Sequence, residues 1–212
     1  MSDWLHGVRV PPLKIRDLRR LAVAIRSHSN LEECAPFPVL RFLEWSMPEL
    51  IEAFDWEIVE SLPDGDEARA YPDGAPHYPQ GPVIQMLAHV YDDAAKNRGR
   101  PRLTILHECG HVLLHRHVAV HHRGPVGADL PTWENSEWQA SQFAVELLMP
   151  APSVETAEDL ESYVERMGVS REAACNRAMQ LERTLGKPLP PWPVTVFASS
   201  HKREGRSPMK AS

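Results

Sequence analysis

Apolar residues at helical spacing are the most regular pattern along the chain. In residues 13–27 they follow the i, i+3, i+4 rule with arginines around them, which predicts an amphipathic helix. A shorter helix is predicted at 40–45, where Pro48 should interrupt or restart it. The remaining predicted helices are 89–96, 102–116, 134–149, 156–167 and one from Ser170, its predicted N-cap, to about residue 183.

Shorter stretches between these helices resemble strands and turns. The predicted strands are residues 56–60, 68–71 and 83–87. Pro-Asp-Gly sequences at 63–65 and 72–74 predict turns on either side of the second strand.

Prolines and glycines divide the second half of the chain. Gly99 and Pro101 should break the chain before the 102–116 helix, and Pro150 and Pro152 should stop the 134–149 helix. Residues 117–132 have the composition of a loop. From residue 186 onward, prolines and small polar residues dominate, which predicts a disordered tail.

Composition limits the class of protein. The 212 residues suit one domain with a short extra segment, and 42% hydrophobic and 25% charged residues are typical of globular proteins. No apolar run approaches the roughly 20 residues that span a membrane, and no secretory signal is visible. The three cysteines, Cys34, Cys109 and Cys175, are an odd number without repeated spacing, so we expect a reducing, cytoplasmic location. A net charge of −6 argues against direct nucleic-acid binding.

The histidines are concentrated in one part of the chain, since seven of the 11 lie between residues 89 and 122. Among them, His107-Glu108-Cys109-Gly110-His111 forms an HExxH motif inside a predicted helix. At about 100° per residue, His107 and His111 lie only about 40° apart, so both imidazoles can reach one metal ion. Glu108 lies beside them, placed to act as a general base without being a ligand. Gly110 costs the helix about 1 kcal/mol relative to alanine, which predicts close approach of another backbone there.

A catalytic zinc needs a third protein ligand, and the 134–149 helix offers one. Glu137 falls within the apolar arc that includes Ala140 and Ala144, two small residues that would allow close helix packing. A carboxylate on a buried face costs several kcal/mol unless it is paired or metal-bound. Glu134 is a rival in the first turn, where the helix dipole alone favours a carboxylate. The polar residues Gln139, Gln142 and Glu146 occupy the other side of this helix.

Zinc held by two histidines and a glutamate would activate water, and Glu108 would take the proton. His115 lies on the same side of the helix as His111 and suits either a supporting contact to the metal site or an oxyanion donor. An interaction of His115 with the helix dipole explains it equally well. Tyr91 and Arg102 are weaker oxyanion candidates.

Two alternatives concern the metal itself. Two histidines and one carboxylate also suit non-haem iron, but the adjacent Glu108 favours hydrolysis. His117, His121 and His122 are better explained as solvated loop residues than as a second metal site, and Cys109 as a small buried residue.

Two blocks of sequence resemble the ImmA/IrrE metallopeptidase family. They are RLTILHECGHVLLH at 102–115 and EWQASQFAVELLMP at 137–150, in the family's order and separation. The resemblance implies a zincin-like α+β fold with a small mixed sheet, zinc on His107, His111 and Glu137, and Glu108 as the catalytic base. The resemblance covers about residues 13–185, and we expect a peptidase domain over 1–150, a helical segment over 151–185 and a Pro-rich tail over 186–212. Cys109 and Ile105 replace commoner residues, and Gln139 stands where some relatives carry a glutamate.

The resemblance also implies a substrate, because characterised relatives cleave helix-turn-helix repressors and many act beside a repressor or antitoxin. We therefore expect a zinc endopeptidase with such a protein as its substrate, and no membrane partner. The alternative is a non-catalytic module that binds a repressor or antitoxin and holds a structural zinc. A zinc hydrolase of small amides is a more distant possibility. The acidic 156–183 segment makes a poor DNA surface and should pack on the peptidase domain.

Overall fold

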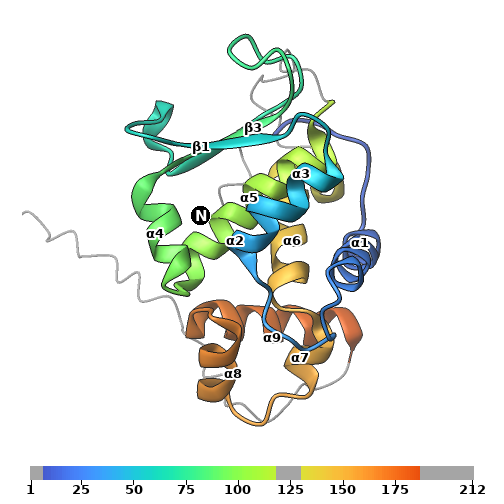
Figure 1. Cartoon of the computed structure of the whole chain (residues 1–212). Coiled ribbons are helices and arrows are strands. Elements are labelled where there is room, and N and C mark those ends of the chain that lie inside the picture. Colours follow the sequence, from blue (N-terminus) through green and yellow to red (C-terminus); the bar gives the residue numbers. More distant parts are fainter. Residues whose placement is uncertain (1–6, 118–129, 187–212) are drawn as a thin grey trace, which may run out of the picture.

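A three-stranded sheet lies over a central helix, α5 (Gly99–His115), and a group of C-terminal helices lies at the opposite end (Figure 1). The structure is a computed structural model and describes residues 7–117 and 130–186. Between sheet and C-terminal group, α5 packs on α6 (Ser136–Leu148), and α1 (Ile15–His28) covers α6 from the side. This is a mixed α+β architecture, consistent with the expected zincin-like domain.

The sheet has the order β1-β3-β2, with β1 (Asp55–Val59), β2 (Ala68–Tyr71) and β3 (Val83–Leu87). β3 runs parallel to β1 and antiparallel to β2, so the sheet is mixed, as expected. On the central strand, Ile84 and Met86 are fully buried, which gives the sheet one face that packs on the helices. β2 is an edge strand and contacts α5 directly. All three strands agree with the prediction to within one residue.

The long predicted helices are confirmed to within a few residues. Besides α1, α5 and α6, they are α4 (Ala88–Ala95), α8 (Leu160–Met167) and α9 (Arg171–Leu185). Ser170 caps α9 as expected, since its side chain accepts a hydrogen bond from the backbone N–H of Ala173. The predicted loop at 117–132 and tail from 186 lie largely outside the described residues.

α6 ends at Leu148, directly before Met149 and Pro150, so the predicted stop is confirmed to within one residue, whereas α5 begins at Gly99, before Pro101, and not at residue 102 as expected. Pro101 lies in the first turn of α5, and Pro152 in the first turn of α7 (Ala151–Glu155). The first-turn N–H groups of a helix have no intrahelical acceptor, so proline loses nothing there. The 156–167 helix was also predicted too long: α8 begins at Leu160, where Asp159 accepts a hydrogen bond from Ser162 N–H as its N-cap.

Pro48 was expected to interrupt or restart its helix, and it lies where an α-helical segment starts again without a break in the helical run. The helical run continues from α2 (Val39–Arg41) through a π-helical turn, η2 (Phe42–Ser46), into α3 (Met47–Leu50). Pro48 lies in the first turn of α3, directly after the π-helical turn. The π-helical turn ends with the Met47 N–H donating to the Phe42 carbonyl oxygen five residues earlier, directly before the proline, which has no N–H to donate.

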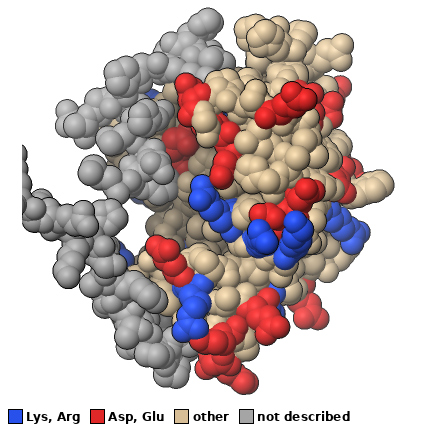
Figure 2. All heavy atoms as spheres, turned by 90° about the vertical axis from the view of Figure 1, so that its left-hand side faces the viewer, with Lys and Arg blue, Asp and Glu red and all other residues tan. Residues whose placement is uncertain are grey.

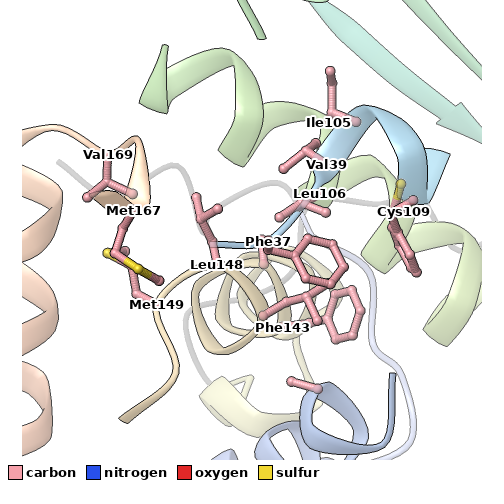
Figure 3. Close-up of a cluster of buried hydrophobic side chains, with 14 of the residues drawn as sticks. Phe37, Val39, Ile105, Leu106, Cys109, Phe143, Leu148, Met149, Met167 and Val169 are labelled. Atoms are coloured by element: carbon pink, nitrogen blue, oxygen red, sulfur yellow. The ribbon is translucent and has the colours of Figure 1, made fainter. Parts of the chain in front are cut away.

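One apolar cluster joins the elements around α5 and α6. Figure 3 shows side chains from the N-terminal half meeting α5, α6 and the C-terminal helices. The labelled members are Phe37, Val39, Ile105, Leu106, Cys109, Phe143, Leu148, Met149, Met167 and Val169. Cys109 is fully buried, as expected of a small apolar residue. The segment 151–185 therefore shares its core with the rest of the described chain.

The α5–α6 crossing is unusually close at Gly110. A Cβ atom at this residue would lie 3.1 Å from Ala140 Cα and Phe143 Cδ1, and 3.2 Å from the Ala140 carbonyl oxygen. Such contacts leave almost no room for a side chain, because Ala140 presents helix backbone that cannot turn away. The close backbone approach predicted from Gly110 is confirmed.

The polar side of α6 is buried as well. Gln139, Gln142 and Glu146 are all at most 4% exposed. Glu146 is bound by two arginines: Arg177 of α9 at 2.6 and 3.0 Å, and Arg19 of α1 at 3.1 and 3.2 Å. This buried ion-pair network fixes α6 between α1 and α9.

The ion-pair network lowers the pKa of the Glu146 carboxyl. Burial favours its neutral form, but Arg177 and then Arg19 outweigh burial and hold the pKa of Glu146 below its ordinary 4.5. Its stabilisation is therefore complete above pH 4.5 and is lost as the pH falls through the lowered pKa.

The surface carries both signs of charge. On the face that includes α4, acidic and basic side chains lie close together (Figure 2). Asp93 pairs with Lys96 and Arg98, and Glu67 pairs with Arg100. A face with this mixture gives phosphate backbones little net attraction. Within 7–117 and 130–186, no helix is long and apolar enough to cross a membrane.

We predict that Gly110→Val lowers the free energy of unfolding by about 1–3 kcal/mol, because the new side chain must push α5 and α6 apart. Urea denaturation measures the change. Ala24→Val, an equivalent enlargement at an exposed position of α1, is the control and should change stability by less than about 0.5 kcal/mol. Equal stability of the Gly110→Val variant and wild type would contradict the close crossing.

Arg177→Met should cost about 3–5 kcal/mol at neutral pH, because it leaves the Glu146 carboxylate buried without its main partner. Adding Glu146→Leu to the same protein should restore part of the loss, since no buried charge then remains unpaired. Thermal and urea unfolding of both variants test this. A double variant less stable than Arg177→Met alone would argue against the network.

Candidate metal centre

The crossing of α5 and α6 brings four polar side chains together. His107 and His111 project from one face of α5, one helical turn apart, and Glu137 and Ser141 project from α6 at the same spacing. The small residues Gly110 and Ala140 lie at the crossing and allow this approach.

The ligand atoms of His107, His111 and Glu137 converge, all within 4.8 Å of one another. The two Nε2 atoms are 3.0 Å apart, and the Glu137 carboxylate oxygens lie 3.2 Å from His107 Nε2 and 3.3 Å from His111 Nε2. A tetrahedral ion with bonds of 2.0–2.1 Å would separate its ligand atoms by about 3.3 Å. The three residues therefore fit a zinc-sized ion with little movement.

The Glu137 carboxyl is suited to remain ionised. Burial favours the neutral acid, but hydrogen bonds from His107 and His111 outweigh burial and hold the pKa of Glu137 well below its usual range. The three side chains are 19–31% exposed, so the group is open to solvent on one side. An ion at this position would have room for a further, non-protein ligand.

The rival Glu134 is not in this group. It lies in a short 3-10 turn before α6, η5 (Thr132–Glu134), and its carboxylate pairs with Arg9 at 3.5 Å. The helix N-cap is Asn135, whose side chain accepts the Trp138 N–H. Of the two glutamates, the structure brings only Glu137 to the histidines.

Glu108 lies between this group and the sheet. Its Oε2 accepts a 2.7 Å hydrogen bond from the backbone N–H of Ala70 on the edge strand β2. Burial raises the pKa of Glu108. The charge interaction with the imidazoles of His107 and His111 lowers this pKa, but by less than burial raises it. A carboxylate with a raised pKa is a stronger base than one in water.

His115 contacts the candidate ligands from behind. It is 7% exposed, its Nδ1 lies 3.3 Å from His111 Nδ1, and its Nε2 lies 2.9 Å from Gln139 Oε1. Burial lowers the pKa of His115 to about 4, so the imidazole is neutral at physiological pH. Of the roles considered for His115, this position suits a supporting contact to His111 better than an oxyanion donor.

The weaker oxyanion candidates are engaged elsewhere. The Tyr91 hydroxyl donates to Glu44 at 2.5 Å, and the ring stacks on Trp56. Arg102 is buried and donates to the carbonyl oxygens of Phe37, Met167 and Gly168. Arg102 therefore fastens the C-terminal end of α8 to the N-terminal half of the chain.

Among the residues that the structure describes, no other histidine joins the group. His117 is exposed and lies 2.9 Å from Asp73, in agreement with a solvated position. His121 and His122 lie outside the described residues.

Two residues near the metal centre escaped sequence reasoning. Ser141 Oγ lies 2.9 Å from His107 Nδ1, and Gln139 meets His115. Ser141 follows Glu137 by four residues, a spacing that places it on the same helix face. Gln139 gave no comparable signal, because its contact depends on how α5 and α6 cross.

An HExxH helix crossed by a glutamate-bearing helix beneath a small mixed sheet is the arrangement of zincin-like metallopeptidase domains. Residues 88–179 match the family model described as the IrrE N-terminal-like domain, Peptidase_M78, and this range contains every residue of the candidate centre. The match over these residues supports membership of the ImmA/IrrE family.

Two further comparisons were made. No curated protein gives a significant match to this chain. Among solved structures, a chain described as a Mycobacterium tuberculosis transcriptional regulator is similar, with 16% identity and a TM-score of 0.46 over 79% of this chain. The similar region is 48% of the regulator, so this chain spans about half of its length.

We predict that Glu137→Gln lowers the bound metal, measured by elemental analysis after dialysis, whereas Glu134→Gln leaves it unchanged. A neutral amide is a poor zinc ligand, and only Glu137 faces the histidines. The two substitutions are three residues apart in the sequence and remove the same charge. Loss of metal in the Glu134→Gln protein, with metal retained in Glu137→Gln, would reverse the assignment.

Proposed function

We propose that this protein is a zinc-dependent endopeptidase. His107, His111 and Glu137 hold the ion, and Glu108 is the general base. The observation that carries the proposal is the convergence of three ligand atoms within 4.8 Å, with the buried Glu108 carboxylate next to them on the same helix. Similarity to the ImmA/IrrE family supports the assignment.

Zinc in this position would lower the pKa of water and polarise the scissile carbonyl. The chain's own contribution to proton transfer is Glu108. Because Oε2 accepts the Ala70 hydrogen bond, we assign proton abstraction from the attacking water to Oε1. The same carboxyl would then deliver the proton to the leaving amine.

The position of β2 supports a peptide as the substrate. β2 is an edge strand, and the N–H of its residue Ala70 reaches the general base. An extended peptide can align with the exposed backbone of such an edge and place its carbonyl near the base. A small amide would gain nothing from this edge, so the structure favours the peptidase over the small-amide hydrolase.

We propose a helix-turn-helix repressor or antitoxin as the substrate protein. This part of the proposal is supported by the similarity to that family, since the geometry of the centre is compatible with any extended peptide. A repressor encoded next to this protein is the natural first substrate to test.

The alternative, a non-catalytic binding module with a structural zinc, is less consistent with the site. Structural zinc sites are closed by four protein ligands, whereas this group has three among the described residues, and its side chains are partly exposed. A structural site also gives no reason for a buried carboxylate beside the ligands.

We predict that Glu108→Gln retains the metal but slows cleavage of the co-expressed repressor by about 10²–10⁴-fold, the usual contribution of a general base. Glu49→Gln, at an exposed residue of α3, is the control and should cleave like wild type. Cleavage by metal-loaded Glu108→Gln at the wild-type rate would contradict the mechanism. Binding of the repressor by wild type without cleavage would favour the binding module.

A further inference from the structure

We propose that Gln139 and His115 are positioning residues that fix the proton arrangement of His111, so that its bare Nε2 faces the metal. The proposal rests on the proposed metal site for its last step only. Neither residue contacts the candidate ion position itself. They form a chain of hydrogen bonds from the backbone to His111 Nδ1, in which the backbone carbonyls orient Gln139 and Gln139 determines which nitrogen of His115 donates to it.

The chain begins at the side-chain amide of Gln139. This residue is fully buried, and its Nε2 lies 2.8 Å from the Pro11 carbonyl oxygen and 2.7 Å from the Trp133 carbonyl oxygen. Carbonyl oxygens only accept, so the NH₂ end of the amide must face them. The opposite end, Oε1, is an acceptor and lies 2.9 Å from His115 Nε2. His115 must therefore carry a proton on Nε2.

The next bond joins the two imidazoles. His115 Nδ1 lies 3.3 Å from His111 Nδ1, and only one of these nitrogens can carry a proton between them. A histidine that binds metal through Nε2 carries its proton on Nδ1. His111 therefore donates to His115, and His115 presents a bare Nδ1. Every donor in the chain then has one acceptor.

The two candidate histidine ligands are thus supported differently. His107 Nδ1 faces the Ser141 hydroxyl at 2.9 Å, and a hydroxyl can rotate to donate or to accept. Ser141 therefore tolerates either proton arrangement of His107. Of the two histidines, only His111 is supported by a series of hydrogen bonds that begins at a side chain, Gln139, whose orientation is fixed.

The Gln139 end of this hydrogen-bond chain is held by two paired backbone segments. Residues 8–13 pair with the segment before α6, with Val10 N–H donating to the Glu134 carbonyl and Leu13 N–H to the Trp133 carbonyl, both at 2.9 Å. The two carbonyls that orient Gln139 come from these paired segments. The N-terminal segment therefore contributes to the metal centre without contacting it.

The proton positions of the histidines can be observed directly by ¹⁵N NMR on the full-length protein, with and without zinc. We expect a protonated Nε2 and bare Nδ1 on His115 in both states, because Gln139 alone dictates them, and Nδ1–H with zinc-bound Nε2 on His111. A protonated Nδ1 on His115 would overturn the proposal. If wild type binds no zinc, the proposed function fails, while the His115 proton position still tests the Gln139 contact.

Zinc affinity provides the second test. His115→Phe removes the acceptor and should weaken zinc binding about 10–100-fold, the usual effect of losing a partner of a metal ligand. His115→Gln should bind more tightly than His115→Phe, because its amide can donate to Gln139 and accept from His111. His89→Phe, at an exposed histidine of α4, is the control and should bind like wild type. Thermal unfolding of the metal-free variants checks that each is folded. A folded His115→Phe protein with wild-type zinc affinity would also overturn the proposal.

Discussion

The close crossing of α5 and α6 is the constraint on which the structure depends. Residue 110 has almost no space for a side chain, because a Cβ atom there would lie only 3.1 Å from Ala140 Cα and Phe143 Cδ1. At this distance two side chains from each helix meet across the interface. His107 and His111 face Glu137 and Ser141, and the four polar groups would be too far apart if a larger residue separated the helices.

Such a crossing has to be held in place, and the buried polar side of α6 does this. Glu146 is bound by Arg177 from α9 and Arg19 from α1, while Gln139 connects α6 to the N-terminal segment. These contacts explain why the C-terminal helices and the N-terminal segment share a core with the candidate metal centre. Burial of a paired charge adds little net stability, but it makes displacement of α6 costly. The arrangement favours a rigid centre, which a metal site with a general base requires.

The sequence was informative wherever a residue's role follows from its own helix. The spacing of His107, Glu108 and His111 shows that they share one face, and Glu137 is anomalous on an apolar arc, so these residues could be identified without a structure. The strands and long helices were predictable for the same reason. The start of α5 was placed too late, because proline is compatible with the first turn of a helix as well as with the residues before it, and Pro101 lies in that first turn. Gln139, Ser141 and the Ala70 contact to Glu108 were not predictable, since each depends on a partner from another element.

Zinc K-edge X-ray absorption of the zinc-loaded protein tests the central claim most directly, namely that the α5–α6 crossing builds a metal site from two histidines and a carboxylate. The account predicts a first shell of nitrogen and oxygen only, at about 2.0–2.1 Å, with the multiple-scattering pattern of two imidazoles. A sulfur shell at about 2.3 Å would place the ion on a cysteine, and a spectrum without imidazole scattering would place it away from α5. Either result would contradict the account.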